Sequence, residues 1–216
     1  MWGKRYPLSL SAFTTRPGIL SWFYPSLLWK QPAADTVYLT FDDGPHPDIT
    51  PWVLDQLAGY QATGTFFCVG DNVRKYPGVF AAITAGGHQV GNHTYNHLNG
   101  WKTPDKLYLD NIAQAAAYIP SPLFRPPYGR ITYTQLRKLR VQQPHVKVVM
   151  WSLLTGDFDV DLAPEACIAH TLKSIRPGDI VVFHDSEKAF PRLKIVLPAV
   201  LAHCRAKGWA MKAISL

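Results

Sequence analysis

From Thr36 onward, the chain alternates short apolar runs with stretches of helical period. The apolar runs are rich in β-branched and aromatic residues and end at glycine, proline or polar turn residues, as buried strands do. Strands that alternate with helices are typical of α/β folds with a parallel sheet. We expect seven strands, which cover about 36–41, 63–69, 89–93, 123–124, 146–151, 179–183 and 209–214.

Six helices are expected between these strands, because prolines and short polar residues mark their starts. They cover about 48–57, 77–85, 103–118, 132–140, 164–175 and 191–207. In a barrel of alternating strands and helices, the loops that follow the strands form one face, and active sites lie there. Most polar residues of chemical interest in this chain follow a predicted strand, so we expect them to converge on that face.

The first strand ends in two adjacent carboxylates, Asp42 and Asp43, which are followed by Gly44 and Pro45. Two like charges at the mouth of a buried strand repel, so the pair requires a metal ion, an arginine or a shared proton unless it is a solvated turn. Neighbouring side chains on a strand face opposite sides. They reach one site only if the backbone turns where the strand ends, which Gly44 allows.

Two histidines, His93 and His97, follow the third strand. A spacing of four residues places both on one face of a helical turn, and neutral imidazole is a good zinc ligand. The spacing alone is common. Together with the pair of aspartates, it supplies two nitrogens and one oxygen of an open metal site, where water and substrate take the remaining positions.

These residues resemble the motifs of the polysaccharide deacetylase family, the NodB homology domain of carbohydrate esterase type. Thr40–Pro45 is similar to its first motif, His93–His97 to its second, Arg125–Tyr128 to its third and Val182–His184 to its fifth. The resemblance covers 36–216 and implies a distorted seven-stranded (β/α) barrel, similar to a TIM barrel. Residues 1–35 have no counterpart in these motifs, and we expect an N-terminal extension that packs on the barrel.

The fourth motif of the family departs from its usual pattern of Asp-x-x-Asp-Trp. Leu154 replaces the first carboxylate, Asp157 keeps the second, and Phe158 stands in the place of tryptophan. We expect the loss of the first carboxylate to alter the substrate pocket. The retained Asp157 leaves the machinery of the reaction in place if it is the residue that pairs with the family's histidine acid.

The resemblance implies a ligand set and a general base. Asp43, His93 and His97 would hold a divalent metal, with zinc as the first choice and cobalt, nickel or manganese as alternatives. Asp42 would be the base that takes a proton from the attacking water. Arg125 would hold Asp42 in place through a bidentate contact.

The resemblance also implies an acid and an oxyanion donor. His184 would protonate the leaving amine, and Asp157 would hydrogen-bond its other ring nitrogen and favour the imidazolium. The backbone N–H of Tyr128 would stabilise the oxyanion. Apolar side chains after other strands are expected to wall an acetyl pocket and a sugar platform: Phe158, Val182, Trp151 and Trp101.

The function predicted from these residues is a metal-dependent hydrolase that removes N-acetyl groups from an N-acetylated glycan, such as a chitin oligomer or peptidoglycan. Three alternatives stay open. The first is a deformylase or deacetylase of a lipid-linked sugar at the inner membrane face. The second is a glycan-binding module without turnover. The third is a metal phosphoesterase, which would be expected to have a richer carboxylate cluster for two metals.

The composition limits the possible partners. The 216 residues are 47% hydrophobic, which allows one domain with a substantial core. The net charge of +7 suits an anionic membrane or cell-wall surface, although surface basicity alone explains it. Basic residues are scattered, so we do not expect nucleic acid. The odd set Cys68, Cys167 and Cys204 lacks CxxC spacing, which argues against a disulfide framework and a zinc-cysteine site.

The N-terminal segment gives an expectation about location. Pro17 and Gly18 interrupt the first apolar residues before they reach the length of a secretory signal. The run 19–29 contains Pro25 and is shorter than the about 20 apolar residues of a membrane span. We therefore expect a cytoplasmic or inner-membrane-associated protein. The aromatics of 19–29 suit a bilayer interface, but packing under the open end of the barrel is the simpler interpretation.

Overall fold

The computed structural model describes residues 21, 22 and 24–215. Within this part of the chain, eight strands form one curled sheet, and every pairing between these strands is parallel. The strands are β1 (Thr36–Asp42), β2 (Thr65–Cys68), β3 (Gln89–Asn92), β4 (Leu123–Phe124), β5 (Lys147–Val148), β6 (Leu153–Leu154), β7 (Ile180–His184) and β8 (Ala210–Lys212). Their order is β5-β4-β3-β2-β1-β7-β6, with β8 paired to β1. The predicted class, a distorted (β/α) barrel, is confirmed.

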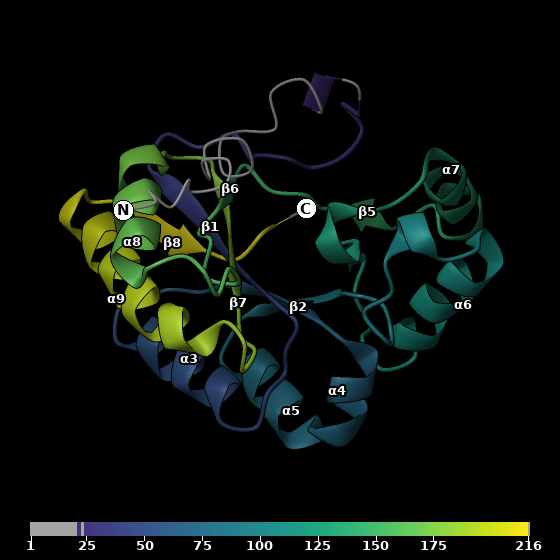
Figure 1. The fold of residues 1–216 in the computed structure, drawn as a ribbon, viewed down its shortest axis with the longest axis horizontal. Helices are drawn as coiled ribbons and strands as arrows, with labels where there is room; N and C mark the ends of the chain where they lie inside the picture. Colours follow the sequence, from purple (N-terminus) through teal and green to yellow (C-terminus); the bar gives the residue numbers. More distant parts are fainter. Residues whose placement is uncertain (1–20, 23, 216) are drawn as a thin grey trace, which may run out of the picture.

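Helices cover the outer side of the sheet (Figure 1). They are α3 (Ile49–Ala58), α4 (Gly70–Lys75), α5 (Pro77–Ala85), α6 (Asp105–Ala116), α7 (Tyr133–Gln142), α8 (Pro164–Ser174) and α9 (Phe190–Ala206). Two short 3-10 turns, η1 (Gly100–Lys102) and η2 (Pro127–Gly129), follow β3 and β4. In Figure 1, α8 and α9 lie on the left, α3, α4 and α5 below, and α6 and α7 on the right.

Two elements differ from the sequence-based expectation. The strand predicted over 146–151 is limited to β5, and β6 is a separate strand. The carbonyls of Val149 and Met150 accept hydrogen bonds from the Arg125 side chain, which ends the regular ladder there. Helix α4 was not predicted, because it has only six residues and begins at a glycine.

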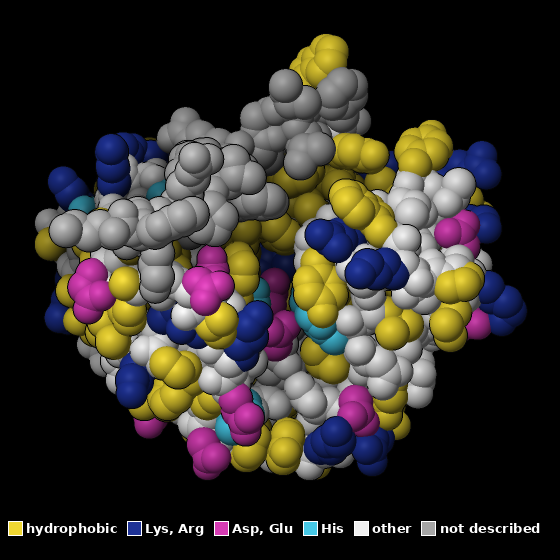
Figure 2. Space-filling model, in the orientation of Figure 1, with side chains coloured by type: hydrophobic (Ala, Val, Ile, Leu, Met, Phe, Trp, Pro, Cys, Tyr) yellow, Lys and Arg dark blue, Asp and Glu magenta, His cyan; other side chains and the backbone are white. Residues whose placement is uncertain are grey.

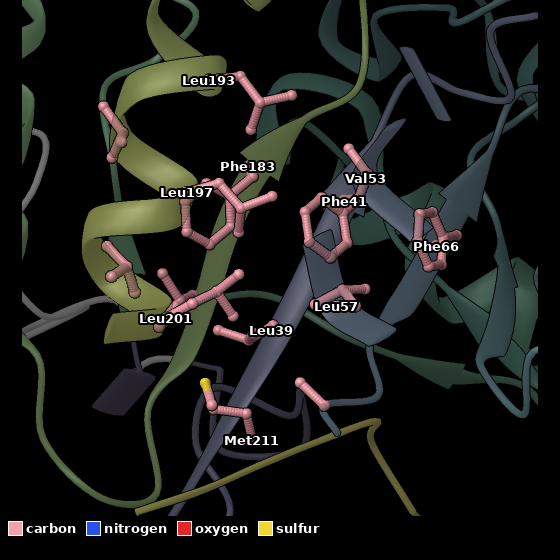
Figure 3. Packing of buried hydrophobic residues seen from close by; sticks show 14 of the residues in the cluster. Leu39, Phe41, Val53, Leu57, Phe66, Phe183, Leu193, Leu197, Leu201 and Met211 are labelled. Atoms are coloured by element: carbon pink, nitrogen blue, oxygen red, sulfur yellow. The ribbon is translucent and has the colours of Figure 1, made fainter. Parts of the chain in front are cut away.

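The core fixes the strands that carry the site. Phe41 of β1 stacks between Phe66 and Phe183, with ring centroids 4.8 and 5.5 Å away. Leucines of α9 cover this stack from outside the sheet (Figure 3). The register places Asp42 of β1 level with His184 of β7. Packing and register together bring Asp42 and His184, which are distant in sequence, to the same end of neighbouring strands.

The described part of the N-terminal segment packs on the barrel. Leu28 bridges to Val149 beside β5, and Lys30 bridges to Asp179 just before β7. Leu27 is buried in a cluster with side chains of α6 and α7. The segment thus contacts both halves of the sheet. Residues 1–20 lie outside the described residues, and the domain boundary at residue 35 stays a prediction.

Two further expectations concern covalent and membrane features. The three cysteines are free and buried. Among the helices of residues 21, 22 and 24–215, none combines the length and apolar character needed to cross a bilayer.

Candidate active site

Asp43, His93 and His97 come together after β1 and β3. One ligand atom from each lies within 4.8 Å of the others. The Nε2 atoms of His97 and His93 lie 3.1 and 3.8 Å from the same Asp43 oxygen, Oδ1. Acidic and histidine side chains are visible in the hollow of the molecular face in Figure 2. The three residues predicted as metal ligands therefore form one cluster.

The backbone builds this cluster differently from the sequence-based expectation. Residues 93–97 form no helical turn, since Thr94 and His97 have φ angles of 64° and 56°. The loop folds back at these left-handed positions and turns both imidazoles towards Asp43. Asn111 of α6 holds the loop, because its side-chain oxygen accepts the N–H groups of residues 95 and 96.

The turn after β1 lies at Asp43 itself, where φ is 82°. The side-chain amide of Asn72 donates to the Asp43 carbonyl over 2.8 Å and supports this strained conformation. Gly44 has a different role from the one expected. A Cβ at that position would lie 2.1 Å from the Asp185 carboxylate, so any larger residue would displace that buried group.

The charge states of the cluster suit a divalent metal. His93 donates its Nδ1–H to the Arg125 carbonyl over 2.8 Å, which leaves Nε2 as an acceptor facing Asp43. Burial lowers the pKa of His93 to about 4, against the opposing charge of Asp42, so its imidazole is neutral. Burial alone would raise the pKa of Asp43, but the His97 hydrogen bond and nearby histidines hold it well below its usual range. One carboxylate and two imidazoles form a donor set that fits zinc.

Asp42 is paired with a buried arginine. The Arg125 Nη1 group donates to Asp42 Oδ1 over 2.7 Å and to the Thr40 hydroxyl over 2.8 Å. The guanidinium also donates to backbone carbonyls and lies 4.1 Å from the centre of the Phe67 ring. The predicted bidentate contact is wrong, because the other nitrogens of Arg125 are directed to the Val149 and Met150 carbonyls. The second carboxylate oxygen of Asp42, Oδ2, accepts no hydrogen bond from Arg125 and remains available in the site.

His184 is held by Asp157. Its Nδ1–H donates to Asp157 Oδ1 over 2.8 Å, and its backbone N–H donates to Oδ2 over 2.8 Å. Burial alone would lower the pKa of His184, but the Asp157 charge and hydrogen bond, with Asp43 and Asp42, raise it to about 9. Arg192 of α9 donates to the Asp157 carbonyl and was not predicted. The Nε2–H of a charged His184 remains available as a proton donor.

The predicted pocket walls have different exposures. The Tyr128 ring lies edge-on to His97 with centroids 4.7 Å apart, and the Phe158 ring lies 5.2 Å from that of His184. Tyr128 has a φ of 59°. Its N–H makes no hydrogen bond within the described part of the chain. Trp151 is half-buried, whereas Val182 is only 1% exposed and lies beneath the surface of the site.

Asp185 is a buried acid that was not predicted as part of the site. Its carboxylate accepts hydrogen bonds from the Gly44 N–H and the Thr50 hydroxyl, and its N–H donates to the Asp42 carbonyl. Burial, assisted by the Asp43 charge, raises the pKa of Asp185 to about 8. The hydrogen bonds of Asp185 thus connect the ends of β1 and β7 to the start of α3.

Comparison with known proteins agrees with these motifs. The family model described as polysaccharide deacetylase matches residues 30–143, which is more than half of the chain. The chain belongs to the polysaccharide deacetylase family. The matched span holds the first three motifs, which contain Asp42, Asp43, both histidines and Arg125. The family resemblance predicted from sequence is confirmed.

Individual family members extend the match to most of this chain. It is 30% identical to a peptidoglycan-N-acetylglucosamine deacetylase of Bacillus cereus, over 87% of this chain and 90% of that protein. It is 29% identical to a chitooligosaccharide deacetylase of Azorhizobium caulinodans, over 82% and 91%. A crystal structure of a peptidoglycan N-acetylglucosamine deacetylase with 4-naphthalen-1-yl-N-oxidanyl-benzamide has a TM-score of 0.77 and 28% identity, over 90% and 94%.

Proposed function

We propose that this member of the family is a metal-dependent hydrolase that removes N-acetyl groups from an N-acetylated glycan. The observation that carries the proposal is the position of two proton-transfer groups beside one metal-ligand cluster. Asp42 and His184 are register partners on neighbouring strands, and Asp43 follows Asp42 directly. A base and an acid at the same ligand cluster are what amide hydrolysis requires.

Asp43, His93 and His97 would hold the metal, with zinc favoured by the donor set. A bound divalent ion supplies Lewis acidity, which polarises the amide carbonyl and acidifies water. His93 presents a neutral nitrogen because its other ring nitrogen donates to a backbone carbonyl. This second contact fixes the ring orientation.

Asp42 is the proposed general base. One of its oxygens is held by Arg125, and the other, Oδ2, lies 4.0 Å from His93 Nε2 on the side of the ligand cluster. That free oxygen takes the proton of the attacking water. The Tyr128 N–H would donate to the oxyanion that forms from the amide carbonyl.

His184 is the proposed general acid. Asp157 holds its Nδ1–H, so the opposite nitrogen carries the proton that passes to the leaving amine as the C–N bond breaks. The raised pKa of His184, about 9, keeps this proton in place near neutral pH. Separate groups for base and acid allow each its own pKa.

The test is acetate release from a panel of substrates with the protein stripped of metal and then reloaded with zinc or cobalt. The panel holds N-acetylglucosamine oligomers, peptidoglycan fragments and acetylated xylan, and Asp42→Asn is the matched control. We expect acetate from an N-acetylated glycan after reloading, and none from the stripped protein or the control. Metal bound at one ion per chain without acetate from any N-acetylated glycan would overturn the proposal and favour a glycan-binding module.

A further inference from the structure

The turns η1 and η2 form one rigid unit beside the active site. The Gly100 N–H donates to the Arg130 carbonyl over 3.2 Å, and a Cβ at Gly100 would lie 2.4 Å from that oxygen. The Trp101 indole N–H donates to the Ile131 carbonyl over 3.3 Å. Gln135 of α7 donates to the Gly100 carbonyl over 2.8 Å. The backbones of the two turns and the Trp101 ring are therefore held together by hydrogen bonds.

Large aromatic side chains of this unit face solvent. Trp101 is 64% exposed and Tyr128 is 61% exposed. The Tyr128 ring also contacts His97, one of the proposed metal ligands, so Tyr128 adjoins the reaction site and Trp101 lies on the same unit. Exposed rings at the edge of a hollow mark a binding surface, and flat aromatic faces suit the apolar faces of sugar rings.

A positive charge lies on the same unit. The Arg130 guanidinium lies over the Trp101 ring, 5.2 Å from its centroid, and Lys102 follows Trp101. In the described residues, neither cation forms an ion pair with a carboxylate. Figure 2 shows basic and hydrophobic side chains together at one edge of the hollow. The charges of Arg130 and Lys102 are therefore available to bind an anionic ligand.

A hollow that Asp43 and His97 line differs in charge from this unit. Its volume is about 390 Å³, and Asp71, Asn72 and Tyr95 are among its other lining residues. The basic side chains of α4 near it are already paired, since Asp71 binds both Arg74 and Lys75. Of these two places, the unit of η1 and η2 is therefore the one that favours an anion.

We propose that Trp101, Tyr128 and Arg130, assisted by Lys102, form a subsite for a carboxylate-bearing sugar next to the N-acetylated sugar at the metal cluster. This inference rests on the proposed function and narrows it to glycans in which neutral N-acetylated sugars and anionic sugars are neighbours. The rings contact the sugar face, and the guanidinium binds the carboxylate. Neutral chitin oligomers have no carboxylate, so they would contact only the aromatic rings of this subsite.

The experiment measures binding by calorimetry to the metal-loaded Asp42→Asn protein, so that turnover is not needed. The ligand is an N-acetylated tetrasaccharide with lactyl-ether carboxylates on alternate sugars, compared with its methyl ester. Arg130→Gln is expected to weaken binding of the acid about tenfold and to leave the ester unchanged. Trp101→Ala is expected to weaken both ligands.

The matched control is Arg205→Gln, because Arg205 also lies over an aromatic ring, at 4.1 Å from Tyr60, but on the last turn of α9. It should change neither affinity. Equal affinity of the acid and the ester, or no effect of Arg130→Gln, would overturn the subsite even if acetate is released. A charge-dependent difference without acetate release would keep the subsite and reject the deacetylase proposal.

Discussion

Asp42 and Asp43 are neighbours in sequence but have different partners. Asp42 is buried against Arg125, whereas Asp43 faces His93 and His97. The left-handed backbone at Asp43 separates them, because it turns the second carboxylate out of the strand. Substitutions at the two positions should therefore have different consequences.

Asp42→Asn is expected to keep the metal and to lower kcat by about 100- to 10,000-fold, the usual contribution of a general base. Asparagine still accepts the Arg125 hydrogen bond, so the variant should fold, but with a lower free energy of unfolding because the charged partner of Arg125 is removed. Metal content and acetate release measured on the same sample check both parts. His93→Ala should lose metal and activity together, and unchanged turnover in Asp42→Asn would reject its role as the base.

Asp157→Asn is expected to lower the pKa of His184 from about 9 by roughly 1 to 3 units, because the adjacent negative charge is removed. NMR titration of the His184 ring in the metal-free protein measures the change directly. His203, which packs against Trp209 on the last turn of α9, provides an internal control in the same spectra. A His184 pKa that does not move would reject the Asp157 assignment.

The same ion pair links stability to pH. The folded-state pKa of His184 is raised above its usual value of about 6.5, so its contribution to stability is fully present below that pH. The contribution is lost as pH rises through about 9. The metal-free protein should therefore lose free energy of unfolding between these values, and Asp157→Asn should lose less over the same range. Urea unfolding at several pH values measures this.

The sequence motifs predicted which side chains form the site. They did not predict the backbone conformation that brings these side chains together. Asp43, His93 and His97 were predicted together and lie together. The left-handed residues Thr94 and His97 were not predicted, because neither is glycine and their conformation depends on hydrogen bonds from α6. The contacts of Arg125 with carbonyls depend on tertiary packing in the same way.

At the scale of elements, the ends of β1 and β7 are joined through Asp185. Its carboxylate accepts from the turn after β1 and from Thr50 in the first turn of α3. Because this group is buried, its hydrogen-bond partners have no access to water. The position of Asp43 therefore depends on a side chain that follows a different strand.

Asp185→Ala is expected to lower the free energy of unfolding by about 1 to 3 kcal/mol, since it leaves the Gly44 N–H and the Thr50 hydroxyl buried without partners. Urea unfolding checks this value. Asp110→Ala is the matched control, because Asp110 forms an exposed pair with Lys106 and should change stability by less than about 0.5 kcal/mol. Equal effects of both variants would show that Asp185 does not hold the strand ends.

Element boundaries were predictable where local chemistry sets them. Thr132 and Gln135 form a capping box at the start of α7, close to the predicted start. Helix α5 has its predicted bounds, with Pro77 in its first turn and Gly86 after its end. The split between β5 and β6 was not predictable, because it follows from Arg125 and from the pairing of Leu28 with Val149.

At the scale of the whole molecule, the metal cluster joins the loops after β1 and β3. A ligand that binds only the folded state stabilises it, by about 2.7 kcal/mol when free metal exceeds Kd 100-fold. Zinc is therefore expected to raise the Tm of the stripped protein. Thermal unfolding with and without zinc measures the shift. His97→Ala should abolish most of it, and an equal shift in that variant would place the zinc elsewhere.

The pairing of Asp42 with Arg125 has a consequence for how this sequence can change during evolution. Arg125 is completely buried, and removal of its charged partner costs about 3 to 5 kcal/mol in comparable buried pairs. A descendant that abandons hydrolysis would therefore lose stability by replacing Asp42, whereas Asp43 and His97, which are partly exposed, could be replaced at a smaller cost. In a diverged lineage, retention of Asp42 is expected for stability alone. Retention of the proposed ligands Asp43 and His97 is the better sign that catalysis is still under selection.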